Sequence, residues 1–194
     1  DPVDTIAVAE RLYNDGMKPV PHLAARSLRD ADQLDDLLSH FANRAGVSEV
    51  LVIGGGVDKP VGQFSDTMQV LSTGLIQKHG IRSIGVAGHP EGSPDFSDEV
   101  ALEALRLKQE FSKRSGAELR IVTQFGFDAE SFINWASSIK SSGVDLPIHI
   151  GVAGPAKITT LLKFAAMCGV GNSMTFLKKR SNALLTLATG FDPE

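Results

Sequence analysis

The chain has 194 residues, 42% of them hydrophobic and 22% charged, which is enough for one globular domain with a substantial core. Its net charge of −4 and its dispersed basic residues, apart from a short LKKR run at 177–180, argue against nucleic acid or an anionic membrane as a partner. Its one cysteine, Cys168, excludes an intramolecular disulfide and a cysteine-rich zinc site, and it suits a reducing, cytoplasmic location.

Helical and strand patterns alternate from the start of the chain. The opening segment DPVDTIAVAERL predicts a helix, without a signal peptide, and no apolar run approaches the twenty residues of a membrane span. Short runs rich in Val, Ile and Leu predict strands buried on both faces. In chain order, these strands and the helices between them are expected at 17–23 (strand), 30–46 (helix), 48–55 (strand), 64–80 (helix), 82–88 (strand), 97–116 (helix), 119–125 (strand), 128–143 (helix) and 147–153 (strand).

Caps and apolar stripes support the helices. Ser97 or Asp98 can cap the helix over 97–116, whose stripe includes Val100, and Asp128 can cap the helix over 128–143. A glycine closes each of the four helices that lie between strands.

The alternation has a period of roughly thirty residues, which is the length of a βαβ unit. It predicts a parallel α/β fold in one domain over 1–194 and leaves a barrel and a doubly wound sheet both open. A (β/α)8 barrel would need about three strands besides these five. In either fold the loops after the strands carry the chemistry, here PHLAARS, IGGGVDKPVGQ, AGHPEGSPD, TQFGFD and GVAGPAK.

The glycine run IGGG at 53–56 fits neither a P-loop nor a dinucleotide fingerprint, because the required glycine and lysine spacings are absent. Two interpretations remain open. The run is either a flexible strand exit or a place where the backbone approaches a flat ligand closely.

Histidines and one glutamine are the other candidates at strand ends. His22, His89 and His149, with Glu91 and Asp95 close by, could converge as a metal site in a barrel, although their spacing carries no metal motif and structural roles are commoner. Gln124 ends an apolar strand, and its carboxamide can donate and accept together, as binding of a heterocycle requires. Its alternative role is to tether a neighbouring loop.

The order and spacing of PHLAARS, IGGG, AGHPEGSPD, LRLKQEF and IVTQFGFD resemble the methylenetetrahydrofolate reductase family over roughly residues 19–130. Members of that family typically carry a Pro-His-Leu strand, a Leu-Arg-Gly-Asp strand exit, an Ala-x-Pro-Glu-x-His-Pro-Glu loop and a Thr-Gln-Phe-Phe-Phe-Asp strand. The Thr-Gln-Phe element and the Pro-Glu-x-x-Pro loop together are the most specific part of the match.

The resemblance implies a (β/α)8 TIM-type barrel, of which this chain supplies about five parallel strands. It implies binding of FAD and reduction of 5,10-methylenetetrahydrofolate to 5-methyltetrahydrofolate with NAD(P)H, in one-carbon and methionine metabolism. A homo-oligomer is also compatible with it. The family's catalytic glutamate lies on a strand that precedes the matched region, so no catalytic residue is named.

The resemblance also implies individual sites. Gln124 and Phe125 would bind the folate, and the cofactor contacts would be His22, Gly54, Gly55, Gly56, Ala87, His89 and Ser93. Several of these depart from the family pattern: Gly54 and Gly56 replace an arginine and an aspartate, Ser93 a histidine, and Glu110 a lysine. Losing two cations and gaining an anion beside a diphosphate is electrostatically unfavourable, which predicts weak FAD binding.

Three alternatives to a flavin-dependent reductase are open. Hydride could pass directly from the nicotinamide to the folate without a flavin. The protein could bind folate without reducing it. It could instead be a metal-dependent barrel lyase or hydrolase that uses His22, His89 and Glu91.

Overall fold

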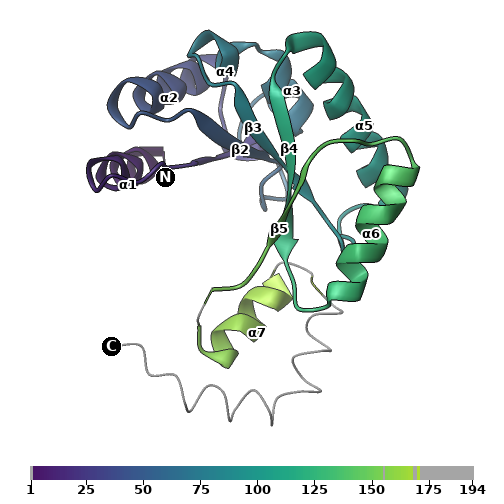
Figure 1. Cartoon of the computed structure of the whole chain (residues 1–194). Coiled ribbons are helices and arrows are strands. Elements are labelled where there is room, and N and C mark those ends of the chain that lie inside the picture. Colours follow the sequence, from purple (N-terminus) through teal and green to yellow (C-terminus); the bar gives the residue numbers. More distant parts are fainter. Residues whose placement is uncertain (1, 155, 168–169, 171–194) are drawn as a thin grey trace. The chain divides into compact units, whose positions relative to one another are not determined.

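The structure, a computed structural model, describes residues 2–154, 156–167 and 170 (Figure 1). Helices and strands alternate along these residues, as the sequence predicts. Their bounds are α1 (Pro2–Asn14), β1 (His22–Ala24), the short 3-10 helix η1 (Ala25–Ser27), α2 (Ala31–Arg44), β2 (Glu49–Ile53), α3 (Thr67–Ser72), α4 (Leu75–Lys78), β3 (Ser83–Gly88), α5 (Asp98–Ser115), β4 (Glu118–Phe125), α6 (Ala129–Ser141), β5 (Ile148–Gly151) and α7 (Ile158–Met167). Cys168 and the run at 177–180 lie outside the described residues.

The five strands form one parallel sheet in the order β1-β2-β3-β4-β5. The register pairs His22 with Leu51 and Leu51 with Gly85. A doubly wound sheet reverses its strand order at a switch point, whereas a β/α barrel adds each strand beside the preceding one. The sequential order therefore confirms the barrel-type winding and decides between the two folds that the periodicity left open.

The prediction that the strands are buried on both faces is confirmed at the centre of β3, where Ile84, Gly85 and Val86 are all buried, and is wrong for β2 and β4. Burial alternates along β2 and β4: Val50, Val52 and Ile121 are fully buried, whereas Leu51 and Gln124 are half-buried. In β2 the buried face packs against apolar neighbours such as those of α3. The half-buried face carries polar groups, and such groups stay near water or need partners.

A polar network occupies the half-buried face at the start of the strands. The Arg120 guanidinium of β4 donates to Glu49 Oε2 of β2 at 2.7 Å and to Ser83 Oγ of β3 at 2.6 Å. The Arg120 side chain is only 14% exposed, so these partners offset the cost of its burial. Because side chains alternate along a strand, Gln124 lies on the same face of β4 as Arg120, towards the carboxyl end.

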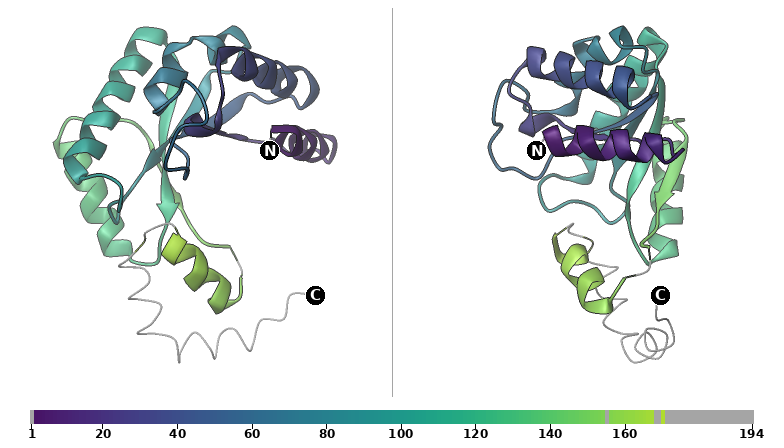
Figure 2. Two further views of the ribbon diagram at one scale, coloured as in Figure 1. Left: turned by 180° about the vertical axis from the view of Figure 1, so that it is seen from behind. Right: turned by 90° about the vertical axis from the view of Figure 1, so that its left-hand side faces the viewer.

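The chain divides into two compact units, Asp1–Ala87 with Leu107–Ile121 and Gly88–Arg106 with Val122–Glu194. The first unit has an aliphatic core around Phe41, to which α2, α4 and the first strands contribute; its fully buried members include Leu23, Leu34, Leu38, Val50, Val52, Leu71, Ile76 and Ile84. Here α1 packs against α2, as both views of Figure 2 allow the reader to follow. In the second unit, Phe132 and Ile139 of α6 are buried together with Leu105 and Val144.

The helix predicted over 64–80 is in fact two helices, α3 and α4. Gly74 separates them with φ +71°, a left-handed conformation that glycine adopts without strain. Thr73 Oγ1 supports the break, since it donates to Val70 O at 2.7 Å and accepts from Leu75 N at 3.2 Å. The apolar period continues across the break, so periodicity alone does not reveal it.

The predicted caps are confirmed in both long helices of the second half. The Asp128 carboxylate accepts from Glu130 N and Ser131 Oγ, and these hydrogen bonds lower its pKa. Ser97 precedes α5, and its hydroxyl accepts from Val100 N at 3.5 Å. The apolar stripe of α5 is narrower than predicted, because Val100 is 57% exposed.

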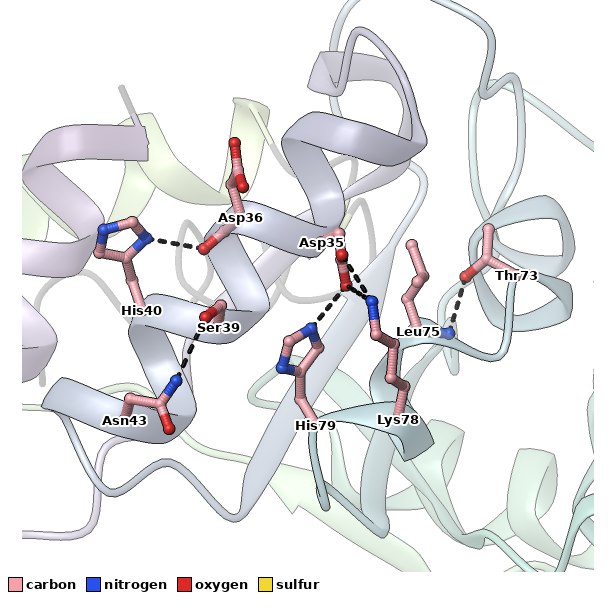
Figure 3. A network of polar contacts seen from close by, with 9 residues as sticks. All are labelled: Asp35, Asp36, Ser39, His40, Asn43, Thr73, Leu75, Lys78 and His79. Carbon is pink, nitrogen blue, oxygen red and sulfur yellow. Dashed lines mark hydrogen bonds and ion pairs between the residues drawn. The ribbon is translucent and has the colours of Figure 1, made fainter.

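An ion-paired cluster joins α2 to the end of α4 (Figure 3). Asp35 accepts from Lys78 Nζ at 2.7 Å and contacts His79 Nε2 at 2.6 Å. These two partners lower the pKa of the Asp35 carboxyl, the Lys78 hydrogen bond contributing most. The cluster links α2 to the residues at the end of α4.

Of the helices in the described part of the chain, none combines the length and apolarity of a membrane span.

Candidate functional site

In the first unit, the loops that follow β1 and β2 are tied together by their backbones. Arg26 N donates to Gly54 O at 3.0 Å, Val61 N to Arg26 O at 2.8 Å and Gln63 N to Arg29 O at 2.9 Å. Two of the predicted functional loops, PHLAARS and IGGGVDKPVGQ, therefore form one layer at the carboxyl ends of their strands.

The glycine run at the β2 exit contains one glycine that the backbone requires and two that it does not. Gly55 has φ +93°, and a Cβ there would lie 3.2 Å from the Ala24 Cβ. At Gly54 and Gly56, a Cβ would meet no atom of the described residues within 4 Å, apart from chain neighbours. Packing within the described chain thus does not account for these two glycines.

The remaining candidates in this unit lie on β1 and β3. His22 is the first residue of β1, is exposed and shares the half-buried face with Leu51. Ala87 is half-buried one residue before the end of β3. The first unit thus holds His22, Gly54, Gly55, Gly56 and Ala87, with the glycines and Ala87 at carboxyl ends of strands.

In the second unit, the loop after β3 is folded by its own contacts. Gly92 N donates to His89 O at 3.0 Å in a turn where Gly92 has φ +79°. The His89 ring packs edge-on against Phe96, with ring centres 5.0 Å apart. Ser93 Oγ accepts from Asp95 N at 3.2 Å. These contacts give the loop a defined shape at the strand end.

Gln124 lies at the end of β4 and is half-buried. Among the described residues, its carboxamide makes one hydrogen bond, from Phe125 N to Oε1 at 3.1 Å. A side chain that tethers a distant loop would bond that loop, whereas this one bonds only its neighbour in sequence. Phe125 and Phe127 pack edge-on beside it, with ring centres 6.0 Å apart.

The loop after β3 meets the end of β4 at Gly126. A Cβ on Gly126 would lie 2.7 Å from Phe132 Cζ and 2.9 Å from Glu91 Oε1, so a side chain at this position would require both to move. The sequence marks Glu91 only as a candidate for a metal site and does not predict this approach. The available signal is the glycine itself, which stands where the strand Thr-Gln-Phe-Phe-Phe-Asp has its middle phenylalanine.

Strands β4 and β5 are also in close contact in the second unit. Gly151 N donates to Thr123 Oγ1 at 2.8 Å, and a Cβ on Gly151 would lie 2.6 Å from Thr123 O. His149 of β5 is exposed. The second unit therefore groups His89, Ser93, Gln124 and Phe125 at the exits of β3 and β4, with Glu91 between them.

Two charged residues of α5 differ in environment. Lys108 is 7% exposed, and burial lowers the pKa of its ammonium although Asp66 acts in the opposite direction. Glu110 is exposed and pairs with Lys113 at 2.8 Å. Within the described residues, no group of three His, Cys, Asp or Glu side chains is arranged to hold a metal ion.

Comparison with known proteins identifies the relatives of the chain. The family model described as methylenetetrahydrofolate reductase matches residues 3–181. Methylenetetrahydrofolate reductase 2 of Saccharomyces cerevisiae is 30% identical over 170 residues, which cover 83% of this chain and 26% of that protein. The 5,10-methylenetetrahydrofolate reductase of Salmonella typhimurium is 29% identical over 156 residues, covering 80% and 50%. Methylenetetrahydrofolate reductase (NADH) 1 of Arabidopsis thaliana is 27% identical over 180 residues, covering 84% and 30%. The matched region thus spans about a quarter to a half of these relatives.

Proposed function

Because this chain belongs to the methylenetetrahydrofolate reductase family, we propose that it binds a reduced folate and takes part in the reduction of 5,10-methylenetetrahydrofolate to 5-methyltetrahydrofolate by NAD(P)H. The observation that carries the proposal is the placement of Gln124. Its carboxamide stands at the carboxyl end of a barrel-type strand, where enzymes of this architecture react, and among the described residues it bonds only the backbone of its neighbour.

The chemistry requires a hydride and a proton. The bond between N10 and the methylene carbon breaks, the nicotinamide supplies both electrons as hydride to that carbon, and N10 takes up a proton. A two-sided amide suits the pterin because it can pair with an adjacent donor and acceptor on the ring edge. Gln124 therefore orients the folate, and Phe125 adds an apolar contact.

The family is generally flavin-dependent, but the β2 exit does not fit a flavin diphosphate. Gly54 and Gly56 carry no side chain and face open space in the described structure, so neither a side-chain cation nor a side-chain hydrogen-bond donor extends from them. On α5, the Glu110 carboxylate pairs with Lys113 at 2.8 Å and offsets the positive charge of that lysine. Direct transfer of hydride from the nicotinamide to the folate agrees better with these residues.

Turnover tests the proposal. Purified protein should consume NADH or NADPH only when 5,10-methylenetetrahydrofolate is present, and it should form one 5-methyltetrahydrofolate for each nicotinamide oxidised. Binding of folate without nicotinamide oxidation would instead identify a folate-binding protein that has no reductase activity. Activity abolished by a chelator and restored by a metal would favour the metal-dependent alternative.

A further inference from the structure

We propose that residues 55–60, in the loop that follows β2, form a lid that closes over the nicotinamide cofactor. Both ends of this segment are hydrogen-bonded to one residue: Arg26 N donates to Gly54 O at 3.0 Å, and Val61 N donates to Arg26 O at 2.8 Å. A compact surface loop whose ends lie close together is frequently functional. The lid rests on the proposed function, since that function requires a nicotinamide cofactor to bind and leave in each turnover.

The chain is fixed on both sides of the segment. Ala25, which precedes the residue that holds the two ends, is fully buried. Beyond the loop, Phe64 is buried, and a Cβ on Gly62 would overlap the backbone of Arg29. Residues 55–60 therefore begin and end at points that packing holds in place, as a hinged segment requires.

Between these points the segment lacks such restraints. Among the described residues, none forms a hydrogen bond or an ion pair with residues 55–60, and residues 56–60 are exposed. The next backbone donors are bonded, since Gln63 N donates to Arg29 O at 2.9 Å, as Val61 N does to Arg26 O. Exposed backbone without such bonds belongs to the least stable part of a fold, so the segment can move without breaking contacts of the described chain.

The glycines at the start of the segment are consistent with this movement. Neither Gly54 nor Gly56 has a positive φ, and an added Cβ would meet no atom of the described residues within 4 Å, apart from chain neighbours. The observed conformation would therefore accept alanine at both positions. A second conformation gives the two glycines a role, because glycine reaches φ values that alanine avoids.

The segment is long enough to cover the adjacent strand ends. Three of its six residues reach about 10 Å from the hinge, and neighbouring strands lie about 4.8 Å apart, so the closed segment covers the exits of β1 and β2. Closure excludes water from the site of hydride transfer, which strengthens the electrostatic interactions there, and opening releases the oxidised cofactor.

Amide hydrogen exchange of the whole chain tests the lid. In the free protein, the N–H groups of residues 54–59 should exchange fast, whereas the bonded N–H groups of Val61 and Gln63 should exchange slowly. Saturating NADH or NADPH should slow exchange at residues 54–59 by about tenfold, as expected when the loop is closed about nine-tenths of the time. Tetrahydrofolate alone should leave these groups fast. Protection by tetrahydrofolate alone would overturn the assignment to the cofactor.

A double variant separates closure from direct contact with the cofactor. Gly54→Ala together with Gly56→Ala adds methyl groups where the observed conformation has space, so the melting temperature should not fall. Restricting the hinge should lower NADH affinity by roughly 5- to 30-fold. At saturating NADH, residues 54–59 of this variant should still exchange fast. Equal protection in the wild type and the variant would indicate direct contact and would overturn the lid.

The outcomes also separate the lid from the proposed function. If the wild type binds NADH or NADPH while residues 54–59 stay unprotected, the lid is wrong and the proposed function stands. If the wild type binds neither nucleotide, both proposals fail. The exchange measured on the wild type decides the matter even if the double variant does not fold.

Discussion

At the scale of single residues, substitutions of Gln124 distinguish a role in folate binding from a structural role. Gln124→Ala should leave pterin groups unpaired on burial, at a cost of about 1–3 kcal/mol, or roughly tenfold to a hundredfold in folate affinity. Gln124→Glu keeps the shape but removes the donor and should also weaken binding. The melting temperature should hardly change, because within the part of the chain that the structure describes the side chain bonds only Phe125 N. Titration with tetrahydrofolate and thermal unfolding measure the two effects. Unaltered folate affinity with a lowered melting temperature would show that Gln124 is a tether.

Lys108 is a residue whose burial opposes folding. Its pKa is lowered, mainly by burial, so the folded protein holds its proton less tightly than the unfolded chain. Protonated Lys108 therefore costs stability below its lowered pKa, and this cost fades as pH rises towards the ordinary value near 10.5. Lys108→Met should stabilise the protein at pH 7 by about 1 kcal/mol, a typical size for one substitution, and by less at alkaline pH.

Chemical denaturation at several pH values measures this gain. Lys113→Met, on the same helix, is the matched control: Lys113 is exposed and pairs with Glu110, so its loss should change stability by at most about 1 kcal/mol. A destabilised Lys108→Met variant would mean that attraction to Asp66 outweighs the desolvation of the ammonium.

At the scale of elements, the Asp35 cluster joins α2 to α4. The pKa of Asp35 is lowered, so its contribution to stability is present above the ordinary value near 3.8 and is lost as pH falls through the lowered pKa. Asp35→Asn should therefore lower the melting temperature slightly at pH 7, and the difference from wild type should vanish in acid. Asp36→Asn is the control, because Figure 3 shows the Asp36 carboxylate directed away from Lys78 and His79. A deficit that persists in acid after Asp35 has become protonated would contradict the electrostatic explanation.

The sequence predicts the ends of helices and strands well where side chains close in the sequence determine them. Asp128 and Ser97 identify helix starts because their side chains accept from the first turn. The strand predicted over 17–23 is confined to His22–Ala24, since Pro19 and Pro21 have no N–H to donate to a neighbouring strand. The break at Gly74 escapes prediction because the apolar spacing continues across it while the backbone does not.

At the scale of the whole molecule, the main prediction is that the protein binds FAD weakly. With Gly54 and Gly56 at the β2 exit, the purified protein should carry little or no FAD, and its absorbance spectrum should lack flavin bands. Gly54→Arg restores a cation at a position with free space in the described structure and should raise FAD affinity if charge is the limiting factor; Gly54→Gln, of similar length, is its uncharged control. Stoichiometric FAD in the wild type would show that other groups compensate for the missing side chains.

The sequence by itself determined the class of fold and the family. Its alternating apolar runs predicted the parallel strands, and PHLAARS, AGHPEGSPD and IVTQFGFD carried the resemblance that the family match to residues 3–181 confirms. The tertiary structure shows the barrel-type strand order that periodicity left open and the resemblance implied, and it alone decided which face of β2 and β4 is buried and the approach of Glu91 to Gly126. These depend on contacts between residues far apart in the chain, such as 91 and 126, whereas hydrophobic periods and caps report only on neighbours within a few residues.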